Sequence, residues 1–253
     1  MNLFNLTGRT ALITGASQGI GFAIAQALAK AGAHAILNGR TRAPLEDAMH
    51  ALRESGARAD VSAFDVTDAS QVNAAVDVIE STIAPIDILV NSAGIQRRAP
   101  LEQFDDRDWR ELMATNLDGI YYVSKAVARR MIARGRGKII NIGSVQCELA
   151  RPGIAPYTAS KGAVRNLTRG MCADWARYGL QINAIGPGYF ATPLNQALVE
   201  DPAFDEWLRT RTPAGRWGRL EDLHGAAVFL ASAASDFING QTIYVDGGIL
   251  AVI

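Results

Sequence analysis

Cysteine, histidine and long apolar runs are all scarce in this chain of 253 residues. Its two cysteines, Cys147 and Cys172, are too few for a disulfide framework and suit a reducing cytoplasm. The three histidines are scattered, so we expect no metal site. Residues 1–9 hold no apolar stretch behind basic residues, and no run approaches the roughly 20 apolar residues that span a bilayer. We therefore expect a cytoplasmic protein without a secretory leader or a membrane contact.

Charge of one sign is also missing, because 25 basic and 25 acidic residues cancel. This balance argues against a general nucleic-acid or anionic-membrane surface. Hydrophobic residues make up 49% of the chain, enough for one α/β domain of this length to bury a sizeable core. No internal repeat or composition break divides the sequence, so a single domain over residues 1–253 is expected.

Short apolar runs alternate with longer segments of helical pattern along the whole chain. The strand-like runs cover residues 11–14, 33–38, 61–64, 86–91, 138–142, 181–185 and 242–245. The helix-patterned segments cover residues 22–31, 45–55, 70–83, 108–134, 160–178 and 220–231. This alternation predicts a doubly wound parallel sheet of about seven strands with helices on both faces. The longest irregular stretch, about 188–218, is long enough for a lid over a substrate, although a plain surface excursion is the alternative.

A glycine-rich turn follows the first apolar run. It contains Gly15, Gly19 and Gly21 and leads directly into a helix-patterned segment that Gly32 ends. Glycines let a backbone approach a pyrophosphate closely, and a helix N-terminus offers free N–H groups and a favourable dipole. The turn therefore predicts a dinucleotide site.

Three polar side chains suit acid–base catalysis. Tyr157 and Lys161 lie four residues apart, which places them on one face of a helix. An ammonium beside a phenol is expected to lower the phenol pKa from about 10 toward the working range of a general acid or base. Ser144 ends a strand-like run, where its hydroxyl could hydrogen-bond a substrate oxygen.

These motifs occur in an order that resembles the classical short-chain dehydrogenase/reductase family over essentially the whole chain. The matching segments are 14–21, Asp65-Val66, 91–94, Asn116, Ser144, Tyr157 with Lys161, Asn183, Pro187-Gly188, Thr192 and 245–248. The family usually has Asn-Asn-Ala-Gly where this chain has Ser92 in second place. The resemblance implies a single Rossmann-type domain, hydride transfer between a nicotinamide and a carbonyl or carbinol carbon, and a homotetramer.

The resemblance also implies roles for individual residues. Tyr157 exchanges a proton with the substrate oxygen, Ser144 polarises the carbonyl, Lys161 holds the nicotinamide ribose, and Asn116 interrupts a helix and holds a water near Lys161. The expected dinucleotide contacts are Gly15, Ser17, Gln18, Gly19, Ile20, Gly21, Arg40, Asp65, Val66, Asn91, Ala93, Gly94, Tyr157, Lys161, Pro187, Gly188 and Thr192.

The end of the second strand-like run indicates which dinucleotide is preferred. An acidic side chain there would accept hydrogen bonds from the adenosine ribose and select NAD. Gly39 stands in its place, and Arg40 follows, able to bind a 2′-phosphate. We expect NADP(H) to be preferred, with NAD(H) as the alternative; Arg42 is a second candidate cation.

Substrate residues are expected in two loops. Arg98, with Arg97, follows the fourth run and could bind a carboxylate, or the pair could be solvated or contact another subunit. Gln146 follows Ser144 and could bind a hydroxyl, and Glu148 and Arg151 add charge nearby.

Segments outside the dinucleotide motifs sharpen the resemblance. Residues 94–98, 168–172, 187–190 and 211–218 are similar to the gluconate 5-dehydrogenases (5-keto-D-gluconate reductases), a group within the family. The expected substrate is therefore a sugar acid. Two alternatives stay open: a reductase of ketoacyl groups on a carrier protein or of another sugar or keto acid, and a dinucleotide-binding regulator without activity.

Overall fold

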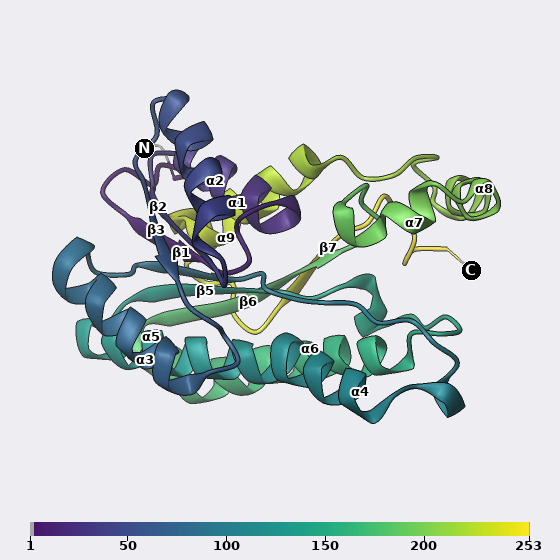
Figure 1. Cartoon of the computed structure of the whole chain (residues 1–253). Coiled ribbons are helices and arrows are strands. Elements are labelled where there is room, and N and C mark those ends of the chain that lie inside the picture. The colour runs from purple at the N-terminus through teal and green to yellow at the C-terminus, as the bar shows by residue number, and fades with distance from the viewer. Residues whose placement is uncertain (1–2, 253) are drawn as a thin grey trace.

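Seven parallel strands form one sheet in the order β3-β2-β1-β4-β5-β6-β7 in the computed structural model, which describes residues 3–252 (Figure 1). The strands are β1 (Thr10–Ile13), β2 (His34–Gly39), β3 (Ala59–Ala63), β4 (Ile88–Asn91), β5 (Gly137–Ile142), β6 (Leu180–Pro187) and β7 (Thr242–Val245). Each strand overlaps one of the apolar runs of the sequence, and every pairing is parallel. The predicted doubly wound α/β fold is confirmed.

Helices cover both faces of the sheet. The α-helices of residues 3–252 are α1 (Gly19–Lys30), α2 (Arg42–Glu54), α3 (Ala69–Val78), α4 (Asp106–Met113), α5 (Gly119–Arg134), α6 (Ala155–Trp175), α7 (Gln196–Val199), α8 (Pro202–Arg211) and α9 (His224–Ala231). In Figure 1, α1, α2 and α9 lie on one face, α3 to α6 lie on the other, and α7 and α8 extend beyond one end of the sheet. Within the described residues, no helix is both long and apolar enough to cross a membrane.

The core has two layers because neighbouring residues of a strand point to opposite faces. Ile13 and Val90 pack with α1 and α9, whereas Leu12 and Leu89 pack with α3, α5 and α6. A parallel sheet covered on both faces needs apolar residues at both kinds of position, which explains the continuous apolar runs. The packing fixes the strand ends from which the polar loops emerge.

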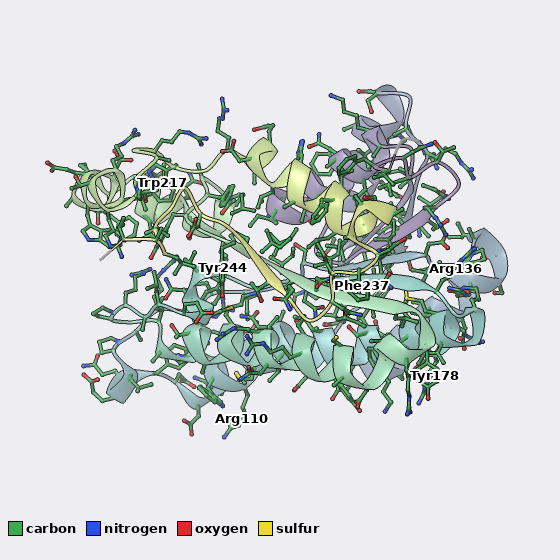
Figure 2. All side chains as sticks on the ribbon, turned by 180° about the vertical axis from the view of Figure 1, so that it is seen from behind. Arg110, Arg136, Tyr178, Trp217, Phe237 and Tyr244 are labelled. Atoms are coloured by element: carbon green, nitrogen blue, oxygen red, sulfur yellow. The ribbon has the colours of Figure 1, made fainter. Side chains whose placement is uncertain are left out.

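The strand order reverses between β1 and β4, whose carboxyl ends lie at one edge of the sheet. In an open parallel sheet, ligands bind at this switch point. Figure 2 shows Trp217 and Tyr244 at the end of the molecule near α8, and Arg136 and Tyr178 at the opposite end. The loops after β1, β4, β5 and β6 come together with residues 192–195, which directly precede α7.

Residues 188–218 are more regular than the sequence indicated, because they contain α7 and α8. The Asp201 carboxylate accepts hydrogen bonds from the N–H groups of Ala203 and Phe204, and Pro202 takes the first helical position of α8. Both are standard start signals. The helices are too short for their apolar spacing to stand out among the prolines and charges of this segment.

Candidate active site

One cavity of about 560 Å³ runs along the carboxyl ends of the central strands. It brings together most of the residues that the sequence indicated. The expected dinucleotide contacts on its wall are Gly15, Ser17, Gln18, Gly19, Ile20, Gly21, Arg40, Asp65, Val66, Ala93, Gly94, Pro187, Gly188 and Thr192. The expected catalytic and substrate residues on its wall are Arg98, Ser144, Gln146, Tyr157 and Lys161. Asn91, Arg97 and Asn116 are not on the wall.

The glycine-rich turn has the backbone that a pyrophosphate site needs. Gly15 and Gly19 adopt φ angles of 63° and 61°, which L side chains rarely do. A Cβ on Gly21 would lie 2.3 Å from the Gly15 carbonyl oxygen, so only glycine lets α1 start this close to β1. Gln18 precedes α1 without a side-chain capping bond, so its side chain does not occupy the N–H groups of the first helical turn. These features fit a dinucleotide.

Positive charge without an acidic partner marks one end of the cavity. Arg40 is exposed on the cavity wall after β2 and forms no ion pair within residues 3–252. Arg42 instead pairs with Glu46 at 2.7 Å and lies off the wall, so Arg40 is the cation that can meet a ligand here. The Asp65 carboxylate also lines this end, fixed by hydrogen bonds from the Thr67 N–H and hydroxyl groups.

Ser144, Tyr157 and Lys161 meet at the middle of the cavity. Helix α6 carries Tyr157 and Lys161 one turn apart, and Ser144 follows the end of β5. The Lys161 ammonium donates a 2.8 Å hydrogen bond to the Ile142 carbonyl and lies 5.6 Å from the centre of the Tyr157 ring. The arrangement presents a hydroxyl, a phenol and a buried cation to one ligand position.

The electrostatics of this group reverse one expectation. Burial raises the pKa of Tyr157 to about 12, while its hydrogen bond with Ser144 acts in the opposite direction. Burial lowers the pKa of Lys161 to about 8. The predicted lowering of the Tyr157 pKa by Lys161 is therefore not seen in this arrangement, because removing water from the phenolate outweighs the hydrogen bond from Ser144 and the positive charge of Arg98. Tyr157 is held as a protonated acid at neutral pH.

Asn116 acts behind the cavity wall. A π-helical turn, Ala114–Asp118, separates α4 from α5 and places Asn116 in the interior. Its side-chain oxygen accepts from the Ile95 N–H at 2.8 Å, and its amide donates to the Ile95 carbonyl at 3.0 Å. Asn116 thus fixes the loop after β4, beside Gly94. Asn91 is likewise internal, because its amide donates to Ser124 and Asn141 at 2.8 Å each.

The two neighbouring arginines after β4 separate completely. Arg98 lines the cavity, and its guanidinium lies 3.3 Å from the Leu194 carbonyl and 3.4 Å from the Asn195 side-chain oxygen. Arg97 points away and pairs with Glu111 at 2.7 Å and with Asp108 at 3.6 Å. The substrate role expected for Arg97 is therefore not supported by its position.

The loop after β5 and the segment after β6 complete this end of the cavity. Gln146 is buried, and its amide lies 3.4 Å from the Tyr189 hydroxyl. Arg151 joins them on the wall, whereas Glu148 is turned outward to Arg165 and Tyr244.

Sequence reasoning missed Tyr189 and Asn195 as wall residues. Their nearness to the Pro187-Gly188 motif was the available signal, because a segment that continues from the end of β6 must pass the cavity mouth.

Comparison with known proteins agrees with this geometry. The family model described as enoyl-(acyl carrier protein) reductase matches residues 15–250. The chain is 58% identical over 248 residues to gluconate 5-dehydrogenase of Gluconobacter oxydans (strain 621H), covering 98% of this chain and 97% of that protein. It is 51% identical over 252 residues to 5-keto-D-gluconate 5-reductase of Escherichia coli (strain K12), covering 100% and 99% of the two chains.

A solved structure shows the same similarity in space. The crystal structure of a gluconate 5-dehydrogenase from Burkholderia cenocepacia J2315 in complex with NADP and tartrate has a TM-score of 0.98 and 59% identity, covering 100% of this chain and 99% of that one. These matches extend over essentially the whole chain and confirm the family that the motifs indicated. The parallel sheet, the glycine-rich turn and the group of Ser144, Tyr157 and Lys161 agree with it. This chain belongs to the short-chain dehydrogenase/reductase family.

Proposed function

We propose that the protein is an NADP(H)-dependent oxidoreductase that interconverts 5-keto-D-gluconate and D-gluconate. The observation that carries the proposal is one cavity whose wall holds both an acid–base phenol, Tyr157, and a cation, Arg98, that forms no ion pair among residues 3–252. The names of the relatives at 58% and 51% identity support the substrate, and the NADP bound by the relative at 59% identity supports the cofactor.

Each residue then has a defined task in the reduction. When bound, the nicotinamide supplies the hydride that the carbonyl carbon receives. Ser144 donates a hydrogen bond to the carbonyl oxygen, where negative charge develops. Tyr157 transfers its phenolic proton to that oxygen, so the ketone becomes a secondary alcohol, and solvent returns a proton to the phenol. Lys161 supplies positive charge beside the ring, held in place by the Ile142 carbonyl.

A substrate panel tests the proposal. The purified enzyme is assayed with NADPH and NADH against 5-keto-D-gluconate, other keto acids, neutral ketoses and a ketoacyl thioester, followed by nicotinamide absorbance. We expect the highest kcat/KM for 5-keto-D-gluconate with NADPH. A higher value for the ketoacyl thioester would make the carrier-protein reductase the better description. Among the relatives, a galactitol 2-dehydrogenase (L-tagatose-forming) at 44% identity makes neutral ketoses an essential part of the panel.

The two directions of the reaction should respond differently to pH. Because the Tyr157 pKa is raised to about 12, the phenol carries its proton throughout the neutral range and suits reduction. Oxidation needs the phenolate, whose population increases about tenfold per pH unit below the pKa. We expect kcat/KM for gluconate oxidation to climb between about pH 7 and 10, while reduction does not. Initial rates in both directions test this; a flat oxidation profile would contradict it.

Arg40→Ala should change the choice of cofactor. Only NADPH carries a 2′-phosphate, so the variant should lose about 10- to 100-fold in NADPH affinity, the worth of one charged hydrogen bond, and little in NADH affinity. Fluorescence titration with each cofactor measures both constants. Arg42→Ala is the matched control, because Arg42 already forms an ion pair with Glu46. Equal losses for NADPH and NADH would rule out the phosphate role.

We propose that the enzyme works as a cytoplasmic homotetramer. Both cysteines are free thiols, as a reducing compartment maintains them, and this supports the cytoplasmic location.

The tetramer is supported by exposed apolar side chains. Ile249 of the apolar C-terminal segment is buried in its own chain, but Val252 stays 44% exposed. Trp109 and Tyr121, of α4 and α5, are also exposed. Apolar surface of this kind favours burial between subunits. Light scattering at micromolar concentration should give four times the chain mass of 27.0 kDa, and a monomeric mass would refute the tetramer.

A further inference from the structure

The charged groups of the cavity are unevenly distributed. Its arginines are Arg40, Arg98 and Arg151, and none of them forms an ion pair within residues 3–252. Arg97, one residue from Arg98 but outside the cavity, has two acidic partners. Asp65 is the acidic side chain on the described wall, and it lies at the end with Arg40. The other end therefore holds Arg98 and Arg151 without a neutralising carboxylate.

These two arginines come from different loops, and their positive charges repel each other. Arg98 follows β4, and Arg151 follows β5 and precedes α6. Burial lowers the pKa of Arg98, and the positive charge of Arg151 lowers it further. Two like charges in one partly buried cavity repel each other, and an anion between them would relieve that repulsion.

Arg151 also has donor capacity that the protein leaves unused. Its Nε is buried and has no hydrogen-bond partner within the described residues. Its guanidinium stacks over the ring of Phe204 in α8, with 5.5 Å between the guanidinium carbon and the ring centre. It also interacts with the Tyr189 hydroxyl. Stacking of this kind holds the planar fork of Arg151 in place on the cavity wall, where such a fork can bind a carboxylate.

We propose that Arg151 is a specificity-determining residue that binds the substrate carboxylate together with Arg98. The inference rests on the proposed sugar-acid function and extends it to a residue in a second loop. The two arginines form a site that favours acids over neutral polyols and ketoses. Because Phe204 belongs to α8, the same contact ties the segment 188–218 to the bound acid, as a lid requires.

Binding of D-gluconate to the enzyme saturated with NADPH tests the proposal without turnover, because an alcohol and a reduced cofactor do not react. We expect Arg151→Gln to raise the calorimetric Kd for gluconate about 10- to 100-fold, as expected for one charged hydrogen-bonding group. The Kd for NADPH should not change. The matched control is Arg169→Gln, because Arg169 is exposed on α6 away from the cavity. Phe204→Leu should weaken gluconate binding less than Arg151→Gln does.

A double variant separates shared from independent binding. If Arg98 and Arg151 hold the same carboxylate, the Arg98→Ala and Arg151→Gln effects should combine to much less than their product. Gluconate binding by Arg151→Gln that stays within about twofold of the wild type would overturn the inference, and so would an equal loss of acid and neutral substrates. Arg151→Lys keeps the charge but not the planar fork, so its Kd for gluconate should fall between those of the wild type and Arg151→Gln. This conservative variant controls for a folding defect.

Malonate distinguishes this inference from the proposed function. If the wild type neither turns over 5-keto-D-gluconate nor binds gluconate, the sugar-acid proposal fails. If the wild type nevertheless binds malonate and Arg151→Gln does not, the two-arginine site is still supported. If the wild type reduces 5-keto-D-gluconate and Arg151→Gln binds both gluconate and malonate normally, the inference fails alone.

Discussion

Tyr157→Phe should reduce kcat for both directions by about 10²- to 10⁴-fold, the usual worth of one positioned acid or base. The substitution removes only the phenolic oxygen, which carries the transferred proton, and it keeps the ring that lies near Lys161. Cofactor affinity should therefore remain close to that of the wild type. Steady-state assays with 5-keto-D-gluconate and NADPH give kcat for reduction, and fluorescence titration gives the affinity for NADPH.

Tyr178→Phe is the matched control for this variant. Tyr178 lies at the opposite end of the molecule from Trp217 (Figure 2), and its hydroxyl contacts only the Arg177 side chain among the hydrogen bonds of residues 3–252. It should keep wild-type activity. If Tyr157→Phe turns over at a rate close to that of the wild type, Tyr157 does not transfer the proton and another group must do so.

Arg98→Ala should raise KM for 5-keto-D-gluconate by about one to two orders of magnitude. A hydrogen bond to a charged group is worth about 1.5–3 kcal/mol, and 1.4 kcal/mol corresponds to a factor of ten. Neutral ketones should lose little, since they have no carboxylate. Steady-state kinetics with one acidic and one neutral substrate measure the difference.

Arg97→Ala provides the control for Arg98 because it removes the same charge one residue away, outside the cavity. It should leave KM for the acid nearly unchanged. Arg98 also contacts Leu194 and Asn195. If its removal disorders residues 188–218, binding of acidic and of neutral substrates should weaken alike. That outcome would assign Arg98 a structural role.

Some of these residues could be placed from the sequence because local pattern decides them. The turn between β1 and α1 depends on the positive φ angles of Gly15 and Gly19 and on the close approach of Gly21 to Gly15, and Tyr157 and Lys161 share a face through helix geometry alone. The strands were recognisable because both faces of the sheet are buried, which makes each run continuously apolar.

Other features depended on partners far away in the chain. Arg97 and Arg98 are equivalent in the sequence, and Asp108 and Glu111, both on α4, decide which one turns outward. The sign of the Tyr157 pKa shift depends on how completely the packed cavity removes water from the phenol, which spacing does not reveal. The stacking of Arg151 on Phe204 joins residues 53 positions apart, across β6.

Transfer of deuterium from NADPH labelled at both C4 hydrogens shows whether the enzyme delivers hydride to C5 of the substrate. The labelled cofactor is incubated with 5-keto-D-gluconate and the enzyme, and the product is analysed by NMR and mass spectrometry. We expect D-gluconate with one deuterium on C5, because hydride reaches the carbonyl carbon while Tyr157 supplies the proton on oxygen. Absence of deuterium from the product, or deuterium on another carbon, would contradict it.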